Sequence, residues 1–265
     1  MVFTSPGEIA FQIFNYQVRW YGVFMFLAII CGVLVMLKIA KKFYKEYNED
    51  FLYDLAFILI ILGIIGARLY YVLLDFRYYL KFPVEIFAIW QGGLSIHGAI
   101  IGALIGGGLF IKKKGYNFLT TADLCTFGLV TGQIIGRWGN FFNSEAFGLP
   151  CNLPWKLYIP LESRPINYLL YEYFHPTFLY ESLGSLMILI ILLTLRYKST
   201  KITSGTIFFL YLILYSFIRI LTETIRIDSV LSFGNLHIAH IVSALLLLTG
   251  IIGMFVINKD NKNNC

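Results

Sequence analysis

Long apolar runs, separated by short polar segments, dominate the chain. A helix crosses the hydrocarbon core of a membrane with roughly 20 mainly apolar residues. Runs of about this length lie at residues 20–38, 51–74, 94–111, 119–137, 177–195, 205–226 and 237–257. The pattern predicts an all-α bundle of about seven transmembrane helices that forms a single integral membrane domain over residues 1–265.

Composition also indicates a membrane protein. The 265 residues are 58% hydrophobic and 14% charged, whereas soluble domains usually carry about 25% charged residues. The formal net charge of +6 comes from basic clusters between apolar runs, which indicates contact with anionic lipid and not with nucleic acid. Residues 1–20 lack the basic and apolar segments of a cleaved signal peptide. The 4 cysteines form no CxxC pair, so we expect neither a disulfide framework nor a structural metal.

Basic residues follow every second apolar run. They lie after the first, third, fifth and seventh runs and are Lys38, Lys41, Lys42, Lys45, Lys112, Lys113, Lys114, Arg196, Lys198, Lys201, Lys259 and Lys262. Because cytoplasmic loops are enriched in lysine and arginine, the pattern predicts an N-terminus outside and a C-terminus in the cytoplasm. The longest segment between runs, about 137–176, then faces outward.

Polar side chains within the runs gather at the ends that this topology places outside. They are Tyr21, Arg68, His97, Arg137, Asn140, His175, Tyr180, Glu181, Arg219, Glu223 and Arg226. Successive runs cross in opposite directions, so chance would scatter such residues over both sides. Ionisable groups inside a membrane are costly and usually functional, and the pattern predicts one polar site toward the outer leaflet. Asp54 and Asp123 are exceptions near cytoplasmic ends, and Asp123, after two threonines, is typical of a helix start.

The sixth run carries a polar stripe. Tyr215, Arg219, Glu223 and Arg226 are spaced by four, four and three residues, which places them on one face of a helix. Arg219 and Glu223 alone are explained equally well by a self-neutralising pair that joins two helices. Arg226 adds a positive charge, and a lipid phosphate is the nearest abundant anion to balance it.

A second stretch also indicates an anion such as a lipid phosphate. It reads G-R-W-G-N-F-F-N-S-E-A-F-G, at residues 136–148. Arg137 and Asn140 are three apart and share a helical face, and Asn143 and Glu145 follow them. A helix end anchored at the membrane interface explains the arginine, but it explains the two amides and the glutamate less well. An arginine fork beside asparagine amides suits phosphate oxygens, so we favour a binding site here.

The third run contains His97 within G-G-L-S-I-H-G-A-I-I-G-A-L-I-G-G-G. Gly98, Gly102 and Gly106 form a small-residue edge, which predicts close packing of two helices. His97 itself has two interpretations. It is either a hydrogen-bonded bridge between helices or a base that takes a proton from a nucleophile.

Other polar residues also have two interpretations. Arg68 pairs with Glu181 or binds lipid, and Tyr21 is either an interfacial aromatic or a hydroxyl of the site. His175, followed by proline and threonine, is first of all typical of a helix start.

Together these motifs resemble the bacterial prolipoprotein diacylglyceryl transferase family. Residues 136–148 match every fixed position of that family's signature, G-R-x-G-N-F-x-N-x-E-x-x-G. Further similarity lies in V-R-W-Y-G at 18–22, G-A-R-L at 66–69, G-G-L-S-I-H-G at 92–98, H-P-T at 175–177, L-Y-E-S at 179–182 and R-x-x-x-E-x-x-R at 219–226. The family pattern has Gln where Phe178 stands, a small residue where Tyr70 stands and Gln near His240.

The resemblance implies an enzyme of the bacterial cytoplasmic (inner) membrane whose active site faces the outer leaflet. Such an enzyme transfers the diacylglyceryl group of phosphatidylglycerol to the lipobox cysteine thiol in a prolipoprotein signal peptide. A thioether forms and glycerol 1-phosphate leaves. The reaction needs no cofactor, no metal and no nucleic acid.

The resemblance also implies residue roles. His97 would act as base or proton relay, Arg137 and Arg219 would hold the charge of the leaving phosphate, and Glu223 would orient Arg219. The substrate-binding residues would be Tyr21, Arg68, Asn140, Asn143, Glu145, Gly148, Tyr215 and Arg226, with Asn140, Asn143 and Glu145 on the glycerol headgroup.

Two other classes of protein remain as alternatives. A transporter would place polar residues in both halves of the membrane and usually repeats its halves, and the sequence shows neither feature. Another lipid-modifying transferase would share the composition, but the signature at 136–148 argues against it.

Overall fold

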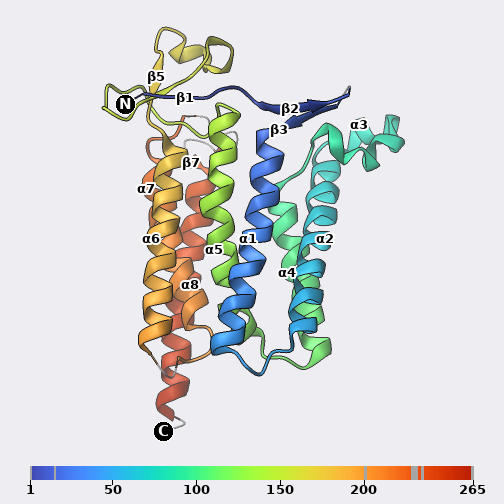
Figure 1. Cartoon of the computed structure of the whole chain (residues 1–265), viewed down its shortest axis with the longest axis vertical. Coiled ribbons are helices and arrows are strands. Elements are labelled where there is room, and N and C mark those ends of the chain that lie inside the picture. Colours follow the sequence, from blue (N-terminus) through green and yellow to red (C-terminus); the bar gives the residue numbers. More distant parts are fainter. Residues whose placement is uncertain (1, 15, 200–201, 228–231, 234–235, 264–265) are drawn as a thin grey trace. The chain divides into compact units, whose positions relative to one another are not determined.

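The computed structural model describes residues 2–14, 16–199, 202–227, 232–233 and 236–263, and long helices account for most of them (Figure 1). Seven helices in this described part are long and apolar enough to cross a membrane. They are α1 (Trp20–Phe43), α2 (Glu49–Leu74), α4 (Ile96–Lys114), α5 (Phe118–Phe142), α6 (Thr177–Lys198), α7 (Thr206–Glu223) and α8 (Ile238–Asn263). The predicted all-α, multi-pass membrane fold is therefore confirmed, while the orientation of the termini stays a prediction.

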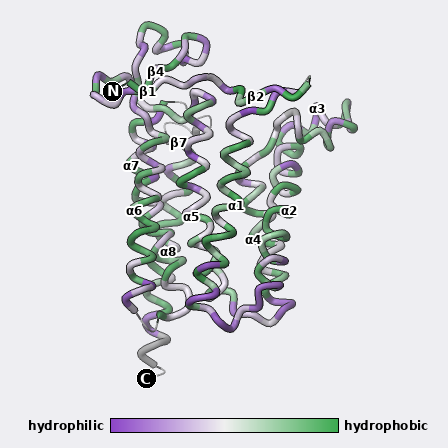
Figure 2. Tube along the Cα trace, viewed as in Figure 1, coloured by the Kyte–Doolittle hydropathy of each residue, from purple (hydrophilic) through white to green (hydrophobic). Residues whose placement is uncertain are grey.

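Hydropathy follows the helices closely. Figure 2 shows hydrophobic residues along the length of the long helices and hydrophilic residues concentrated toward their ends. Helix α5 continues to Phe142, beyond the predicted end near residue 137. The R-W-G-N-F-F stretch therefore forms the last turns of this helix and not the start of the following loop.

Short elements fill the segments between the long helices. Helix α3 (Phe76–Lys81) and the 3-10 turns η1 (Pro83–Phe87) and η2 (Ile89–Gln91) connect α2 to α4, and the 3-10 turns η3 (Leu161–Ser163) and η4 (Ile166–Tyr168) lie between α5 and α6. Strands β2 (Ile9–Ile13) and β3 (Tyr16–Arg19) form an antiparallel hairpin before α1. A three-stranded sheet has the order β1 (Phe3–Thr4), β4 (Leu157–Tyr158), β5 (Tyr173–Phe174), and β6 (Ser232–Phe233) pairs with β7 (Leu236–His237).

The chain divides into two compact units. The first comprises Met1–Ile39 and Ala122–Cys265, and the second comprises Ala40–Thr121. The expectation of a single integral membrane domain over residues 1–265 stays a prediction.

In the first unit, a buried cluster attaches the segment after α5 to the helices. Its members are Phe141, Phe147, Leu157, Ile159, Phe174 and Phe178. Phe178 is fully buried, and its ring packs against those of Phe141 and Trp138, with centroids 5.1 Å and 5.6 Å away. The difference from the family pattern at this position thus serves packing, because burial of a large aromatic stabilises the core.

The start of α7 is capped from another helix. Asp123 of α5 accepts hydrogen bonds from the backbone N–H groups of Gly205 and Phe208, both at 2.7 Å. Asn117 caps α5 instead, because its side chain accepts from the N–H of Thr120 at 2.9 Å. The sequence correctly indicated helix-start chemistry for Asp123 but assigned it to the wrong helix, since the partner lies 82 residues away.

In the second unit, α2 and α4 pack through glycines. A Cβ atom at Gly98 would overlap the carbonyl oxygen of Gly66, and one at Gly102 would overlap that of Leu62. Only hydrogen in place of a side chain allows the two backbones to approach this closely. The predicted packing edge on the third span is therefore confirmed.

Gly98→Ala should destabilise the protein by about 1–3 kcal/mol, because the added methyl group overpacks this contact. Gly108→Ala on the same helix is the matched control, since its Cβ would find its nearest neighbour, Phe118, at an ordinary 3.7 Å. Thermal unfolding of the two purified variants in detergent measures the difference. Equal unfolding temperatures for both variants would show that the backbone contact is loose.

Candidate functional site

One carboxylate joins the polar ends of three helices in the first unit. Glu181, in the first turns of α6, forms an ion pair between its Oε2 and Nη2 of Arg137 on α5, at 2.5 Å. Its Oε1 accepts a hydrogen bond from Nη1 of Arg219 on α7, at 2.7 Å. The two arginines, 82 positions apart in the sequence, therefore share one buried partner.

Two further residues of the predicted stripe join this ion-pair network. Glu223 is the last residue of α7, whereas Arg226 lies beyond the helix end, so its predicted place on the helical face was wrong. Nη2 of Arg219 pairs with Oε2 of Glu223 at 2.8 Å, and Nη1 of Arg226 lies 3.7 Å from Oε1 of Glu181. The carboxylate side chains are 5% and 1% exposed, whereas those of Arg137, Arg219 and Arg226 are 23%, 15% and 16% exposed. The carboxylates thus lie beneath the guanidinium groups. Among the ion pairs that the structure describes here, three guanidinium groups meet two carboxylates, and the cationic groups are outermost.

A second group of polar side chains follows the end of α5. Nδ2 of Asn140 donates to Oε1 of Glu145 at 2.8 Å, and Nδ2 of Asn143 lies 3.4 Å from the same oxygen. Oδ1 of Asn143 is buried and accepts no hydrogen bond from any residue that the structure describes. A buried carbonyl oxygen without a donor is costly, so this oxygen is suited to a hydroxyl group of a ligand.

Tyr21 connects α1 to this region. Its ring lies against Gly139, where an added Cβ would approach ring carbon Cδ2 to 3.0 Å. The phenol is close enough to Glu145 and Arg137 for their charges to act on it. This placement supports the interpretation of Tyr21 as a hydroxyl of the site over that of an interfacial aromatic alone.

The polar stripe of α7 extends one turn further along the helix. Tyr215 stacks on Tyr211 with ring centroids 5.6 Å apart, and Nε2 of Gln133 donates to the Tyr211 hydroxyl at 2.8 Å. Gln133 precedes Arg137 by four residues on α5, as Tyr215 precedes Arg219 on α7. Polar groups on these two helices therefore continue below the arginines.

Gly148 is enclosed by the protein. Its N–H donates to the carbonyl of His175 at 2.9 Å, and a Cβ at this position would come within 2.8 Å of the Ile225 oxygen. The glycine permits the segment after α7 to lie against the loop after α5. A direct contact of Gly148 with substrate stays a prediction.

His175 lies just before α6 in a hydrogen-bonded row. Its Nδ1 is 3.2 Å from the hydroxyl of Tyr180, which also accepts from Nε1 of Trp155 at 3.1 Å. Partial burial lowers the pKa of His175. His175 is thus more than a helix-start residue, because it brings a hydrogen-bonded imidazole to the unit that contains the arginines.

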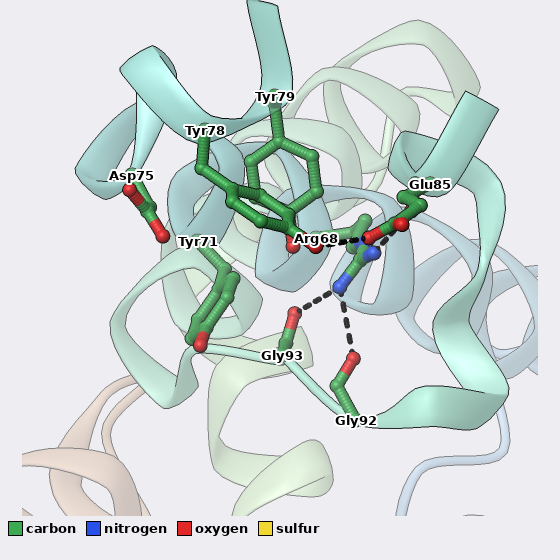
Figure 3. Close-up of a pocket in the computed structure, with 8 residues that line it drawn as sticks. All are labelled: Arg68, Tyr71, Asp75, Tyr78, Tyr79, Glu85, Gly92 and Gly93. Carbon is green, nitrogen blue, oxygen red and sulfur yellow. Dashed lines mark hydrogen bonds between the residues drawn. The ribbon is translucent and has the colours of Figure 1, made fainter. Parts of the chain in front are cut away.

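In the second unit, Arg68 binds main-chain carbonyl groups (Figure 3). Its Nε donates to Ile86 at 2.9 Å, Nη1 donates to Gly92 and Gly93 at 2.8 Å and 2.9 Å, and Nη2 donates to Glu85 at 2.5 Å. These carbonyls occupy four N–H directions of the guanidinium, so Arg68 organises the segment between α3 and α4. Glu181 belongs to the other unit, and its pairing with Arg68 stays a prediction.

A polar cavity of about 260 Å³ adjoins Arg68. It is lined by Arg68, Tyr71, Asp75, Tyr78, Tyr79, Glu85, Gly92 and Gly93. The hydroxyl of Tyr78 donates to Oε2 of Glu85 at 2.7 Å, and the Arg68 guanidinium lies over the ring of Tyr79, 5.3 Å from its centroid. Binding of lipid by Arg68 stays a prediction.

His97 is the second residue of α4, directly after the segment that Arg68 holds. The N–H of Ser95 donates to the carbonyl of Ala67 at 3.1 Å, which ties this segment to α2 a second time. The half-buried imidazole lies 6.1 Å from the ring of Tyr70 between centroids. The G-A-R-L and G-G-L-S-I-H-G motifs therefore form one local structure that positions His97.

The structure thus assembles most predicted site residues of the first unit. It brings together Arg137, Arg219, Glu223 and Arg226 in one network, with Asn140, Asn143, Glu145 and Tyr21 at the end of α5 and Tyr215 one turn along α7. Glu181 was named among the polar residues of the predicted site but was given no catalytic or binding role, although it is the hub of the network. Its signal was a glutamate in an uncharged span, which requires a cationic partner. Among the described residues, no His, Cys, Asp and Glu side chains gather as metal ligands would.

Comparisons with known proteins show which family the chain resembles. The family profile described as "Prolipoprotein diacylglyceryl transferase" matches residues 8–256. A protein of Nostoc sp. (strain PCC 7120) named phosphatidylglycerol–prolipoprotein diacylglyceryl transferase is 47% identical over 257 residues, which cover 96% of this chain and 90% of the relative. Proteins of the same name from Gloeobacter violaceus and Thermotoga maritima are 44% and 42% identical, over 97% and 95% of this chain and 95% and 85% of the relatives.

Proposed function

Because the chain belongs to the prolipoprotein diacylglyceryl transferase family, we propose that the arginine network of α5, α6 and α7 binds the phosphate of phosphatidylglycerol during transfer. The chain is a multi-pass membrane enzyme that transfers the diacylglyceryl group of phosphatidylglycerol to prolipoproteins. One observation carries the placement of the site: three partly exposed guanidinium groups gather above two buried carboxylates. Guanidinium groups that are exposed beside buried carboxylates can bind an anion, and arginine forks suit phosphate oxygens.

The acceptor is the lipobox cysteine of the prolipoprotein, and its thiolate attacks the glycerol carbon that carries the phosphate ester. A carbon–sulfur bond forms, the carbon–oxygen bond breaks, and glycerol 1-phosphate leaves with the electron pair. Arg137 and Arg219 stabilise the negative charge that develops on the leaving phosphate. Glu181 and Glu223 hold these guanidinium groups in place, and His97 takes the thiol proton.

The headgroup of the lipid binds at the end of α5. Glu145 accepts hydrogen bonds from a glycerol hydroxyl, and the buried Oδ1 of Asn143 accepts another. Asn140 fixes the carboxylate through its 2.8 Å hydrogen bond. Tyr21 and Tyr215 flank the site on α1 and α7, and Arg226 adds to the charge.

Asn143→Ala should raise the KM for phosphatidylglycerol by about tenfold, because one hydrogen bond to a neutral hydroxyl contributes about 1 kcal/mol or somewhat more when buried. The matched control is Asn167→Ala, since Asn167 is exposed in η4. Steady-state kinetics at varied lipid content of mixed micelles measure the change. A KM that Asn143→Ala leaves unaltered would remove this residue from the headgroup site.

The membrane placement follows from charge and depth. We place the enzyme in the bacterial cytoplasmic membrane, with the N-terminus outside and the arginine network near the outer leaflet. Support comes from the basic clusters that follow every second span. The network also lies at the end of α5, the start of α6 and the end of α7, which share one side of the bundle.

The decisive assay uses purified protein in vesicles that contain phosphatidylglycerol. A peptide with a lipobox cysteine should gain the mass of a diacylglyceryl group, and the same peptide with serine should not, because a thiolate is the nucleophile. Vesicles of phosphatidylethanolamine alone should give no product. Modification of the serine peptide, or equal transfer from both lipids, would contradict the proposed reaction.

A further inference from the structure

Helices α5, α6 and α7 lie side by side in the first unit (Figure 1). They carry two polar clusters, one toward each end. The upper cluster is the network of Arg137, Glu181 and Arg219. The lower cluster centres on Asp123, which accepts from the N–H groups of Gly205 and Phe208 at 2.7 Å. Both clusters therefore draw on α5 and α7.

The spacing between the clusters is the same on both helices. Asp123 precedes Arg137 by 14 residues on α5, and Gly205 precedes Arg219 by 14 residues along α7. At 1.5 Å per residue this corresponds to about 21 Å of helix axis in each case. Because the two helices run in the same direction from a shared contact, equal lengths bring the two arginines level.

Helix α6 runs in the opposite direction, and the spacing between its own polar residues is similar to the 14 residues on α5 and α7. Its Glu181 lies in the upper cluster, and Arg196, 15 residues later, is close enough to Asp123 for its charge to act on the carboxylate. The hydroxyl of Ser182 also donates to the carbonyl of Ile134 at 2.9 Å, which fixes the start of α6 beside the end of α5. The register of three helices is thus set at both ends.

We propose that Asp123 is a positioning residue that fixes the axial register of α7 against α5, so that Arg137 and Arg219 meet the same phosphate. Asp123 is 2% exposed and both of its carboxylate oxygens are used, one by each N–H. Gly205 has no side chain to cap α7 itself, and its φ of 93° ends the preceding loop directly at the helix. The cap is therefore supplied by the helix whose register matters.

The proposed role differs from ordinary capping in its consequence. A cap on the same helix stabilises that helix but does not link it to a neighbour. A cap supplied by α5 also prevents α7 from sliding along α5. Displacement of a catalytic group by about 1 Å can cost about a hundredfold in rate. A small axial displacement of α7 at Gly205 would move Arg219 and should therefore lower the transfer rate.

The test compares Asp123→Asn and Asp123→Glu with wild type in vesicles that contain phosphatidylglycerol. Asparagine retains one acceptor oxygen and loses the other, and glutamate retains both but moves them outward by one methylene group. Each variant should lower kcat by about tenfold or more, while the KM for lipid changes less than twofold. Asp54→Asn is the matched control, because Asp54 is an exposed aspartate of α2 with one 4.0 Å contact to Lys114, and it should behave as wild type.

Unfolding measurements separate register from stability. The assays are run at least 15 °C below the unfolding midpoint of each variant, where all of the protein is folded. A kcat that falls in both variants supports the inference. Wild-type kcat in Asp123→Glu, or a loss in Asp123→Asn that disappears on cooling below its transition, would overturn it and leave only a cap.

The inference rests on the proposed site, and one more variant keeps the two apart. If Arg137→Ala is inactive while both Asp123 variants match wild type, the register proposal fails and the site stands. If Arg137→Ala is as active as wild type, the arginine network is not where the phosphate binds. The axial register of α7 against α5 then plays no part in catalysis.

Discussion

Arg137→Lys should lower kcat by about a thousandfold, although the substitution keeps the positive charge. Removal of one preorganised donor from a developing oxyanion costs about 10²–10³ in rate. Nη2 of Arg137 already pairs with Glu181 at 2.5 Å, and its partly exposed remaining N–H groups are free to point toward a ligand's phosphate. A lysine ammonium has no planar fork that binds a carboxylate and a phosphate together. Transfer to a lipobox peptide, followed by mass spectrometry, measures the loss.

Arg19→Lys serves as the control for this substitution. Arg19 lies at the end of the β2–β3 hairpin, where its 63% exposed side chain pairs with Glu8 at 3.3 Å. Exposed ion pairs of this kind contribute about 0–1 kcal/mol, so its loss should change neither folding nor transfer. If Arg137→Lys keeps more than about a third of the wild-type rate while Arg19→Lys does the same, the bidentate role of Arg137 is contradicted.

The helices could be predicted because membrane burial imposes a simple rule. Each span needs enough apolar residues to cross the hydrocarbon core, and seven described helices meet that requirement where the apolar runs lie. The end of α5 was placed too early, near residue 137, because arginine and asparagine normally mark the end of a span. Here ion pairs and hydrogen bonds satisfy these groups, so the helix continues to Phe142.

The sheet next to the helices could not be predicted. Its strands are two residues long, and β1 pairs with β4 in parallel, with Phe3 opposite Leu157. Strands this short have no alternating pattern of their own, since alternation needs at least about four residues. They form because the aromatic core beneath them brings distant segments together.

The site divides in the same way between local and distant contacts. The spacing of Arg219 and Glu223 predicts an ion pair on one helix, and the structure shows it at 2.8 Å. The role of Glu181 depends on three helices meeting, which no spacing along the chain encodes. The contacts of Arg68 could not be predicted for the opposite reason: its partners are main-chain carbonyls, which every sequence contains.

His97→Gln should lower kcat at pH 7 by about 10²–10³-fold, the usual contribution of a general base. The loss should shrink as the pH rises, because a cysteine thiol with a pKa of about 8.5 ionises without help. Between pH 7 and pH 9 the thiolate fraction of a free cysteine grows by about 25-fold, and the variant should recover by a similar factor. Wild type should gain much less over the same range. Transfer to a lipobox peptide is measured across this pH series.

His175→Gln is the matched variant, because it removes an imidazole of the unit that contains the arginines. His175 has a pKa lowered by burial, so it is neutral at pH 7 and chemically capable of the same task. Its Nδ1, however, lies 3.2 Å from the hydroxyl of Tyr180, which suits a structural hydrogen bond. If His175→Gln shows the pH-dependent recovery and His97→Gln does not, the base is His175. Because the arginine network is independent of that assignment, such a result would move the proton acceptor to the start of α6 and leave the proposed phosphate site unchanged.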